Sequence, residues 1–135
     1  TRDIVEILPA IGYREAIEEM LRADGLMVMQ AANCNEQIPA KVYEYLRARR
    51  PIVGLADPQG DTAKTMLKQG VAQIAPLEDT ERIEATLTSF LAQTRPGEPP
   101  IDMPPGVSSL SRRASTAKLA ALLDAVCSEP ARTQG

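Results

Sequence analysis

Short apolar runs and amphipathic stretches alternate along the first 92 residues of the chain. Four runs of apolar side chains predict strands, at residues 4–8, 26–29, 51–56 and 71–75. Apolar residues that recur every three or four positions predict helices at residues 13–22, 39–49, 62–69 and 80–91. This order is typical of a mainly parallel sheet with right-handed crossovers. We therefore expect an α/β domain over residues 1–92, with about four strands and flanking helices.

The pattern changes after residue 92. Prolines at positions 96, 99, 100, 104 and 105 predict a linker over residues 93–109 that cannot be helical. Residues 110–127 predict one further helix, followed by a tail at residues 128–135. The apolar face of that helix consists of Leu119, Leu122, Leu123 and Val126. Such a face needs a partner surface, and we expect it to pack on this domain or on another copy.

Composition narrows the function classes. The net charge of −3 argues against broad binding to a nucleic-acid backbone. No apolar run approaches the roughly 20 residues of a membrane span. The chain has no histidine, which excludes histidine-based metal sites and Ser-His or Cys-His pairs within it. Two cysteines do not make a disulfide framework, so a cytoplasmic location is expected.

The polar loop after residues 26–29 is the first place to look for chemistry. In an open parallel sheet, ligands bind beyond the carboxyl ends of the strands. The loop contains Asn35, Glu36, Gln37 and Ile38 and leads into the helix at 39–49. Free N–H groups at a helix N-terminus favour an anion such as phosphate. Lys41 lies in that first turn, against the helix dipole, and either a phosphate ligand or plain solvent exposure accounts for it.

Glu36 and Glu44 are eight positions apart. If the helix begins near Glu36, two turns bring both carboxylates to roughly the same side. Each carboxylate can accept hydrogen bonds from adjacent sugar hydroxyls. By spacing alone, two solvated surface charges are the stronger interpretation.

The residues around Glu36 and Glu44 favour a binding role for the pair over two solvated charges. Glu36 and Glu44 are followed by a helix and then by Pro51 and an apolar strand. The stretch also contains a P-x-K-x-x-E-Y-L pattern from Pro39 to Leu46, and a D-x-x-G-D-T-A pattern follows the strand. The arrangement resembles the paired-glutamate region of retaining GT-B glycosyltransferases, over residues 4–91. The resemblance implies a Rossmann-like domain, the C-terminal half of a bacterial enzyme whose N-terminal acceptor domain is missing. It also implies that the helix at residues 110–127 is an inter-domain element, which crosses back toward that other half.

The resemblance also implies roles for individual residues. Glu44 would bind the ribose hydroxyls of a nucleoside diphosphate sugar, and Glu36 would face the donor sugar near the reacting centre, as the catalytic residue. The backbone of Gln37 and Ile38 would hold the distal phosphate. The remaining donor-binding positions are Asn35 and Lys41, together with Ala10, Ile11 and Gly12, which would meet the base. No metal or cofactor is implied, and the isolated chain would be inactive.

The chain departs from the family pattern in three places. Gln37 and Ile38 stand where the family often has glycines, and Arg49 replaces a glycine before the proline. The family's two opening strands, with the basic pair that neutralises the diphosphate, have no counterpart before Ile4. A sugar-nucleotide epimerase of the same fold is an alternative, as is a non-enzymatic regulatory domain. For a receiver-like module, Asp3 and Asp57 do not reproduce the required acidic layout.

The absence of those two strands has a consequence for the sheet. Residues 4–8 would lose their usual neighbour, and residues 26–29 would become an edge, which is a template for pairing. Either residues 4–8 move in beside residues 26–29, or two chains pair across the gap as a homodimer. We expect the homodimer, because it satisfies both rows of backbone groups at once. A contact of the intact protein with the inner face of the membrane, through the basic cluster Arg47, Arg49 and Arg50, is the minority interpretation.

Overall fold

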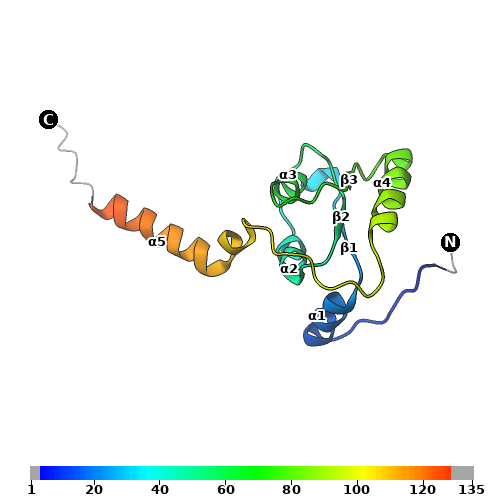
Figure 1. Cartoon of the computed structure of the whole chain (residues 1–135). Helices are drawn as coiled ribbons and strands as arrows, with labels where there is room; N and C mark the ends of the chain where they lie inside the picture. Colours follow the sequence, from blue (N-terminus) through cyan, green and yellow to red (C-terminus); the bar gives the residue numbers. More distant parts are fainter. Residues whose placement is uncertain (1–3, 129–135) are drawn as a thin grey trace.

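The computed structural model describes residues 4–128, in which helices surround a small parallel sheet (Figure 1). The elements, in chain order, are α1 (Tyr13–Arg22), β1 (Leu26–Met29), η1 (Ala32–Cys34), α2 (Ala40–Ala48), β2 (Ile52–Leu55), α3 (Asp61–Lys68), β3 (Ile74–Ala75), α4 (Thr80–Gln93), η2 (Val107–Leu110) and α5 (Arg112–Ser128). The α/β class and the parallel sheet expected from the sequence are confirmed.

The sheet has three strands in the order β1-β2-β3, all parallel. Helices α2 and α3 lie on one side of it and α4 on the other (Figure 1). The central strand β2 is buried at every position, because it has neighbours on both edges and helices on both faces. Strand β1 is an edge, and its Met27 and Met29 are 40% and 65% exposed. The continuous apolar run at residues 26–29 predicts a strand covered on both faces, but Met27 and Met29 stay exposed because α4 packs mainly on β2 and β3.

The strand predicted at residues 4–8 is wrong. These residues form no strand, and Ile4 and Ile7 are 84% and 93% exposed. A strand of four or five residues gains its hydrogen bonds only from a neighbour, and this segment does not pair with β1. The fourth predicted strand shrinks to β3, because the Val71 N–H donates back to Met66 O, 3.0 Å away, and so closes the end of α3.

The predicted helices form with small shifts at their ends. The sequence predicts Asp79 and Asp61 as helix N-caps. The Asp79 carboxylate accepts a hydrogen bond from the Arg82 N–H at 3.0 Å, so the first is confirmed. The second is wrong, because Gly60 occupies the N-cap of α3 and Asp61 is the first helical residue. Helix α2 begins at Ala40 and ends at Ala48, and its C-cap Arg49 has a left-handed φ of 60°. Because α2 begins at Ala40, Glu36 lies outside the helix.

The segment between α4 and α5 is a strap that crosses the molecule. The Ile101 N–H donates to Arg49 O at 2.8 Å, and Arg49 Nε donates back to Ile101 O at 2.6 Å. At its end, Val107 of η2 enters the main core with Val42, Leu46, Met66, Val28 and Ile52. The segment predicted as a linker therefore completes the domain.

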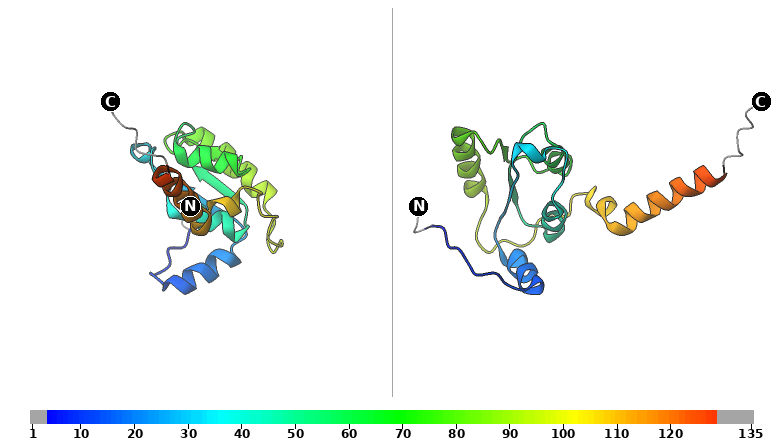
Figure 2. Two further views of the ribbon diagram at one scale, coloured as in Figure 1. Left: turned by 90° about the vertical axis from the view of Figure 1, so that its left-hand side faces the viewer. Right: turned by 180° about the vertical axis from the view of Figure 1, so that it is seen from behind.

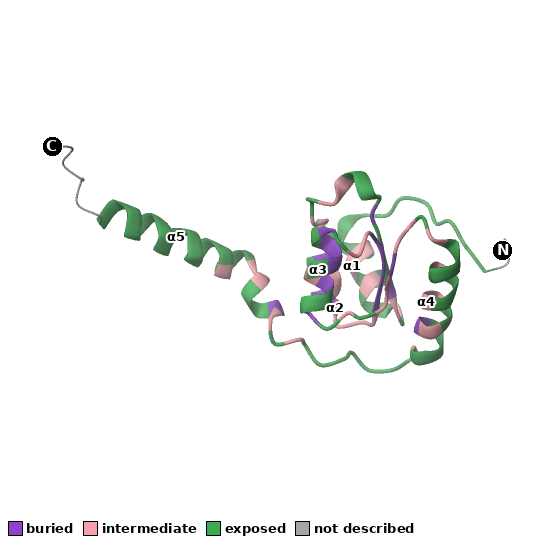
Figure 3. Cartoon of the chain, turned by 90° about the horizontal axis from the view of Figure 1, so that it is seen from above, coloured by how far each residue is buried: buried purple, intermediate pink, exposed green. Residues whose placement is uncertain are grey.

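Helix α5 leaves this body and contacts it only near its first turn. Two further views show α5 projecting from the folded part (Figure 2). It has no buried residue, and its surface is exposed along nearly its whole length (Figure 3). The apolar face expected to pack on something is uncovered, with Leu119, Leu122, Leu123 and Val126 at 55%, 62%, 54% and 63% exposure.

Candidate functional site

Two loops meet at the carboxyl ends of β1 and β2. Residues 30–39 follow β1 and lead into α2, and residues 56–60 follow β2 and lead into α3. The Asp61 N–H donates to Asn35 O at 2.8 Å and joins the two loops. This is the edge where ligands bind in open parallel sheets.

Two buried side chains fix the first loop. Gln30 Nε2 donates to Cys34 O and to Gln37 O, each at 2.9 Å. Thr62 Oγ1 donates to the same Gln37 O at 2.9 Å. Gln30 is 9% exposed and Thr62 is fully buried, so these bonds satisfy groups that would otherwise be costly. The sequence suggests that Asp61 and Thr62 border the ligand pocket, whereas the structure buries Thr62 under the loop. The role of Gln30 was not predicted, although a glutamine directly after an apolar strand was a signal.

The Asp57 carboxylate braces the two loops. Its Oδ1 accepts from the Gln59 N–H at 2.8 Å, and its Oδ2 accepts from Asn35 Nδ2. The Gln59 bond, then the Asn35 bond, lower the pKa of Asp57, with a smaller contribution from Lys64. Asn35, predicted to bind the donor, therefore uses its side chain to hold the loop.

A small hollow of about 250 Å³ lies over the first loop. It is lined by Ala32, Asn33, Cys34, Asn35, Glu36 and Gln37. Glu36 and Gln37 are exposed there. Beside the hollow, α2 starts at Ala40, and its N-cap residue Pro39 makes no side-chain cap hydrogen bond. Among the described residues, the N–H groups of Ile38, Ala40 and Lys41 make no hydrogen bond.

Glu44 lies in a different and larger groove of about 1260 Å³. The groove runs between α1, α2, the strap and the first turn of α5. Glu36 and Glu44 do not line a common pocket, because the chain from Glu36 to Pro39 is not helical and α2 starts only at Ala40. The two hollows nevertheless adjoin along the chain, since Gln37 lines the first and Ile38 the second.

Lys41 pairs with Glu44 one turn along α2. Its Nζ lies 3.1 Å from Glu44 Oε2, and this contact raises the pKa of Lys41. The pair explains a cation in the first turn without a ligand. The Glu44 Oε2 atom is itself buried, and Lys41 Nζ is the charged group that faces it.

The predicted base-binding segment lies at the other end of the sheet. Ala10, Ile11 and Gly12 are exposed and precede α1, and the Gly12 N–H donates to Glu15 Oε2 at 2.9 Å. In Figure 1, α1 is at the bottom of the molecule and η1 at the top. The strand expected at residues 4–8 would have carried this segment to the carboxyl edge, and that strand does not form.

Nothing matches this chain in comparisons with protein-family models, with curated proteins or with solved structures. In residues 4–128, no helix is both long enough and apolar enough to cross a membrane. The same residues contain no group of three or more acidic or cysteine side chains placed to hold a metal ion.

Proposed function

We propose that this chain binds a nucleoside diphosphate sugar across the N-terminus of α2 and serves as the donor half of a bacterial glycosyltransferase. The observation that carries the proposal is the pair of hollows that adjoin at an uncapped helix start. A diphosphate at the helix start would have its sugar on one side and its nucleoside on the other. The resemblance to GT-B enzymes assigns the same order to these residues.

The diphosphate is held mainly by backbone groups. The N–H groups of Ile38, Ala40 and Lys41 are free to donate, and the helix dipole favours negative charge at this end. The loop before them is fixed by Gln30 and Thr62, so its ordering costs little on binding. Lys41 adds a positive charge beside the phosphates. These donors would also stabilise the diphosphate as it leaves during glycosyl transfer.

The two glutamates serve different parts of the ligand. Glu44 accepts hydrogen bonds from the ribose hydroxyls, and Lys41, whose Nζ lies 3.1 Å from Glu44 Oε2, turns from this ion pair toward the phosphates. Glu36 lies on the sugar side, in the smaller hollow, where the transferred sugar would react. Asp57 is less suited to bind the ligand or to carry a phosphoryl group, because both of its oxygens already accept hydrogen bonds within the loops.

Isothermal titration calorimetry with UDP, GDP, ADP and their sugars tests the proposal and identifies the base. We expect Glu44→Ala to weaken binding of the nucleoside diphosphate at least about tenfold, because the ribose contacts are lost. Glu36→Ala should weaken the nucleotide sugar but not the nucleoside diphosphate. Glu84→Ala, on the exposed surface of α4, is the matched control. Equal affinity in wild type and Glu44→Ala would refute the assignment, and no binding at all would favour a regulatory domain.

A further inference from the structure

The proposed function leaves the nucleobase without an assigned contact. Residues 10–12, which were predicted to meet the base, line neither of the two hollows. Tyr13, which directly follows them, does line the groove that holds Glu44. The base attached to a ribose at Glu44 therefore has this groove as its nearest enclosed space.

One face of α2 forms a wall of this groove. It includes Ala40, Tyr43, Glu44 and Arg47, which follow the i, i+3, i+4, i+7 pattern. At a rise of about 1.5 Å per residue, Arg47 lies about 10 Å from Ala40 along the helix axis. A diphosphate at Ala40 and a ribose at Glu44 therefore leave the base beside Tyr43 and Arg47.

Two tyrosines from different helices line the same groove. Tyr13 begins α1 and Tyr43 lies on α2, and their side chains are 74% and 36% exposed. Glu44 raises the pKa of Lys41, and Tyr13 adds a small further contribution, so Tyr13 lies near this ion pair. Aromatic rings open to solvent are groups on which nucleobases stack, because every base has a π-face. The two tyrosines therefore suit a base next to a ribose at Glu44.

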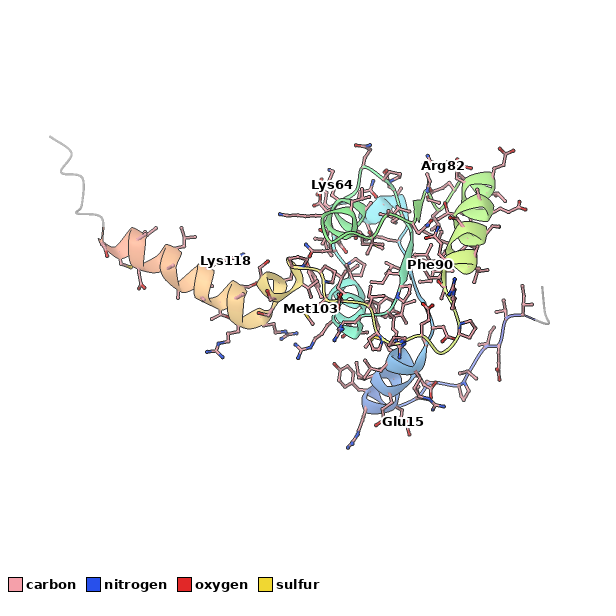
Figure 4. All side chains as sticks on the ribbon, viewed as in Figure 1. Glu15, Lys64, Arg82, Phe90, Met103 and Lys118 are labelled. Atoms are coloured by element: carbon pink, nitrogen blue, oxygen red, sulfur yellow. The ribbon has the colours of Figure 1, made fainter. Side chains whose placement is uncertain are left out.

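The charged side chains that share the groove with Glu44 are hydrogen-bond donors only. They are Arg47 of α2 and Arg112 and Arg113 at the root of α5, whereas Lys118 lies farther out on that helix (Figure 4). Within residues 4–128, the three guanidinium groups make no hydrogen bond or ion pair, unlike those of the arginines that hold the strap. They are therefore available to a ligand.

A guanidinium group discriminates between bases, because it can donate hydrogen bonds but cannot accept them. Guanine presents two adjacent acceptors, O6 and N7, and uracil presents the acceptor O4, whereas adenine presents an amino donor beside N7. Arg47 is the arginine that the spacing along α2 brings next to the base. It therefore favours a base with a carbonyl oxygen on this edge.

We propose that the part of the groove between α1 and α2 is a base subsite, in which Tyr13 and Tyr43 stack on the base and Arg47 donates to its carbonyl oxygen. The subsite thereby selects a guanine or uracil nucleotide over an adenine nucleotide. This inference rests on the proposed function, because a diphosphate at the start of α2 sets the position of the base. It also accounts for the net basic lining of the groove, which suits an anionic ligand.

Isothermal titration calorimetry of the full chain with GDP, UDP and ADP tests the base subsite. We expect GDP or UDP to bind at least about tenfold more tightly than ADP, and the tighter of the two identifies the base. Arg47→Met keeps an apolar stem but removes the donors, so it should abolish this preference. Arg82→Met, on the exposed surface of α4 (Figure 4), is the matched control and should leave the preference intact.

Substitutions of Tyr13 test the stacking. Tyr13→Ala should weaken binding of the preferred nucleotide about tenfold, whereas Tyr13→Phe keeps the ring and should bind like wild type. The side chains of Tyr13 and Arg47 are exposed, so circular dichroism should show the wild-type thermal transition in every variant.

The outcomes separate the base subsite from the proposed function. Equal affinity for the three nucleotides, a preference for ADP, a preference that survives Arg47→Met, or unchanged affinity in Tyr13→Ala overturns the base subsite. Loss of affinity in Glu44→Ala would then still support the ribose contact. Binding of no nucleoside diphosphate overturns the proposed function and the base subsite with it.

Discussion

At the scale of single residues, several polar side chains next to the strands make hydrogen bonds within the loops and are not free to bind a ligand. The carbonyl of Gln37 accepts from both Gln30 and Thr62, and the Asp57 carboxylate accepts from Asn35 and Gln59. A loop fixed this way presents its remaining backbone donors in one geometry. The side chains that the sequence puts forward as binding groups therefore include some, such as Asn35, whose role is to shape the loop.

The brace at Asp57 predicts a dependence of stability on pH. The folded-state pKa of Asp57 lies below its ordinary value, so its contribution is fully present above about pH 4 and is lost as pH falls through the lowered pKa. We expect wild type to be more stable than Asp57→Asn at neutral pH, with the difference shrinking in acid. Urea unfolding between pH 2.5 and 7, a window about the ordinary pKa, measures it.

The matched control for this comparison is Asp124→Asn on α5. In the part of the chain that the structure describes, the Asp124 carboxylate makes no hydrogen bond or ion pair. Its substitution should leave the free energy of unfolding unchanged at every pH. A difference between wild type and Asp57→Asn that does not vary with pH would mean that the carboxylate charge plays no part in the brace.

At the scale of elements, the strap turns a proline-rich stretch into a structural part. Arg50 Nη1 donates to Glu98 O at 2.9 Å, and the Gly97 N–H donates to the Asp24 carboxylate at 2.8 Å. Prolines cannot donate, so the segment is held by the few N–H groups it has and by arginines from the end of α2. The basic cluster at the end of α2 is therefore partly committed to the strap.

We predict that Val107→Ala destabilises the domain by about 1–3 kcal/mol. Val107 is 8% exposed and packs in the main core, so truncation leaves a void beside α2. Val5→Ala makes the same chemical change at a side chain that is 62% exposed and should be neutral. Equal effects of the two substitutions in urea unfolding would show that η2 does not pack on the core.

The sequence predicts the elements whose pattern is local and misses those that depend on distant partners. Helices α1 and α4 and the strands β1 and β2 lie close to their expected positions. The run at residues 4–8 has strand composition, but only a neighbouring edge makes a strand of it. The ion pair between Lys41 and Glu44 was readable from their i, i+3 spacing, whereas the hydrogen bonds of Gln30 and Thr62 join residues brought together only by the fold.

At the scale of the whole molecule, two apolar features are left uncovered: the open edge of β1 with residues 4–8, and the stripe on α5. The sequence favoured a homodimer through the first. The stripe on α5 is a second exposed apolar surface, because Leu119, Leu122, Leu123 and Val126 are each more than half exposed. The two surfaces lie near opposite ends of the chain, so substitutions and truncation separate them by experiment.

Removal of residues 1–8 makes that separation. The side chains of residues 4–8 are exposed and form no strand, so we expect the free energy of unfolding to change by less than about 0.5 kcal/mol. If the apolar stripe on α5 joins two copies instead of residues 4–8, the shortened chain keeps the dimer mass of the full chain in light scattering, because the stripe is intact. A shortened chain that becomes monomeric, while the Leu122→Glu/Leu123→Glu variant of the full chain stays dimeric, would instead place the contact at the edge of β1. Residues 4–8 would then pair as a strand only in the dimer, since an edge strand supplies the backbone partners that this segment lacks in a single chain.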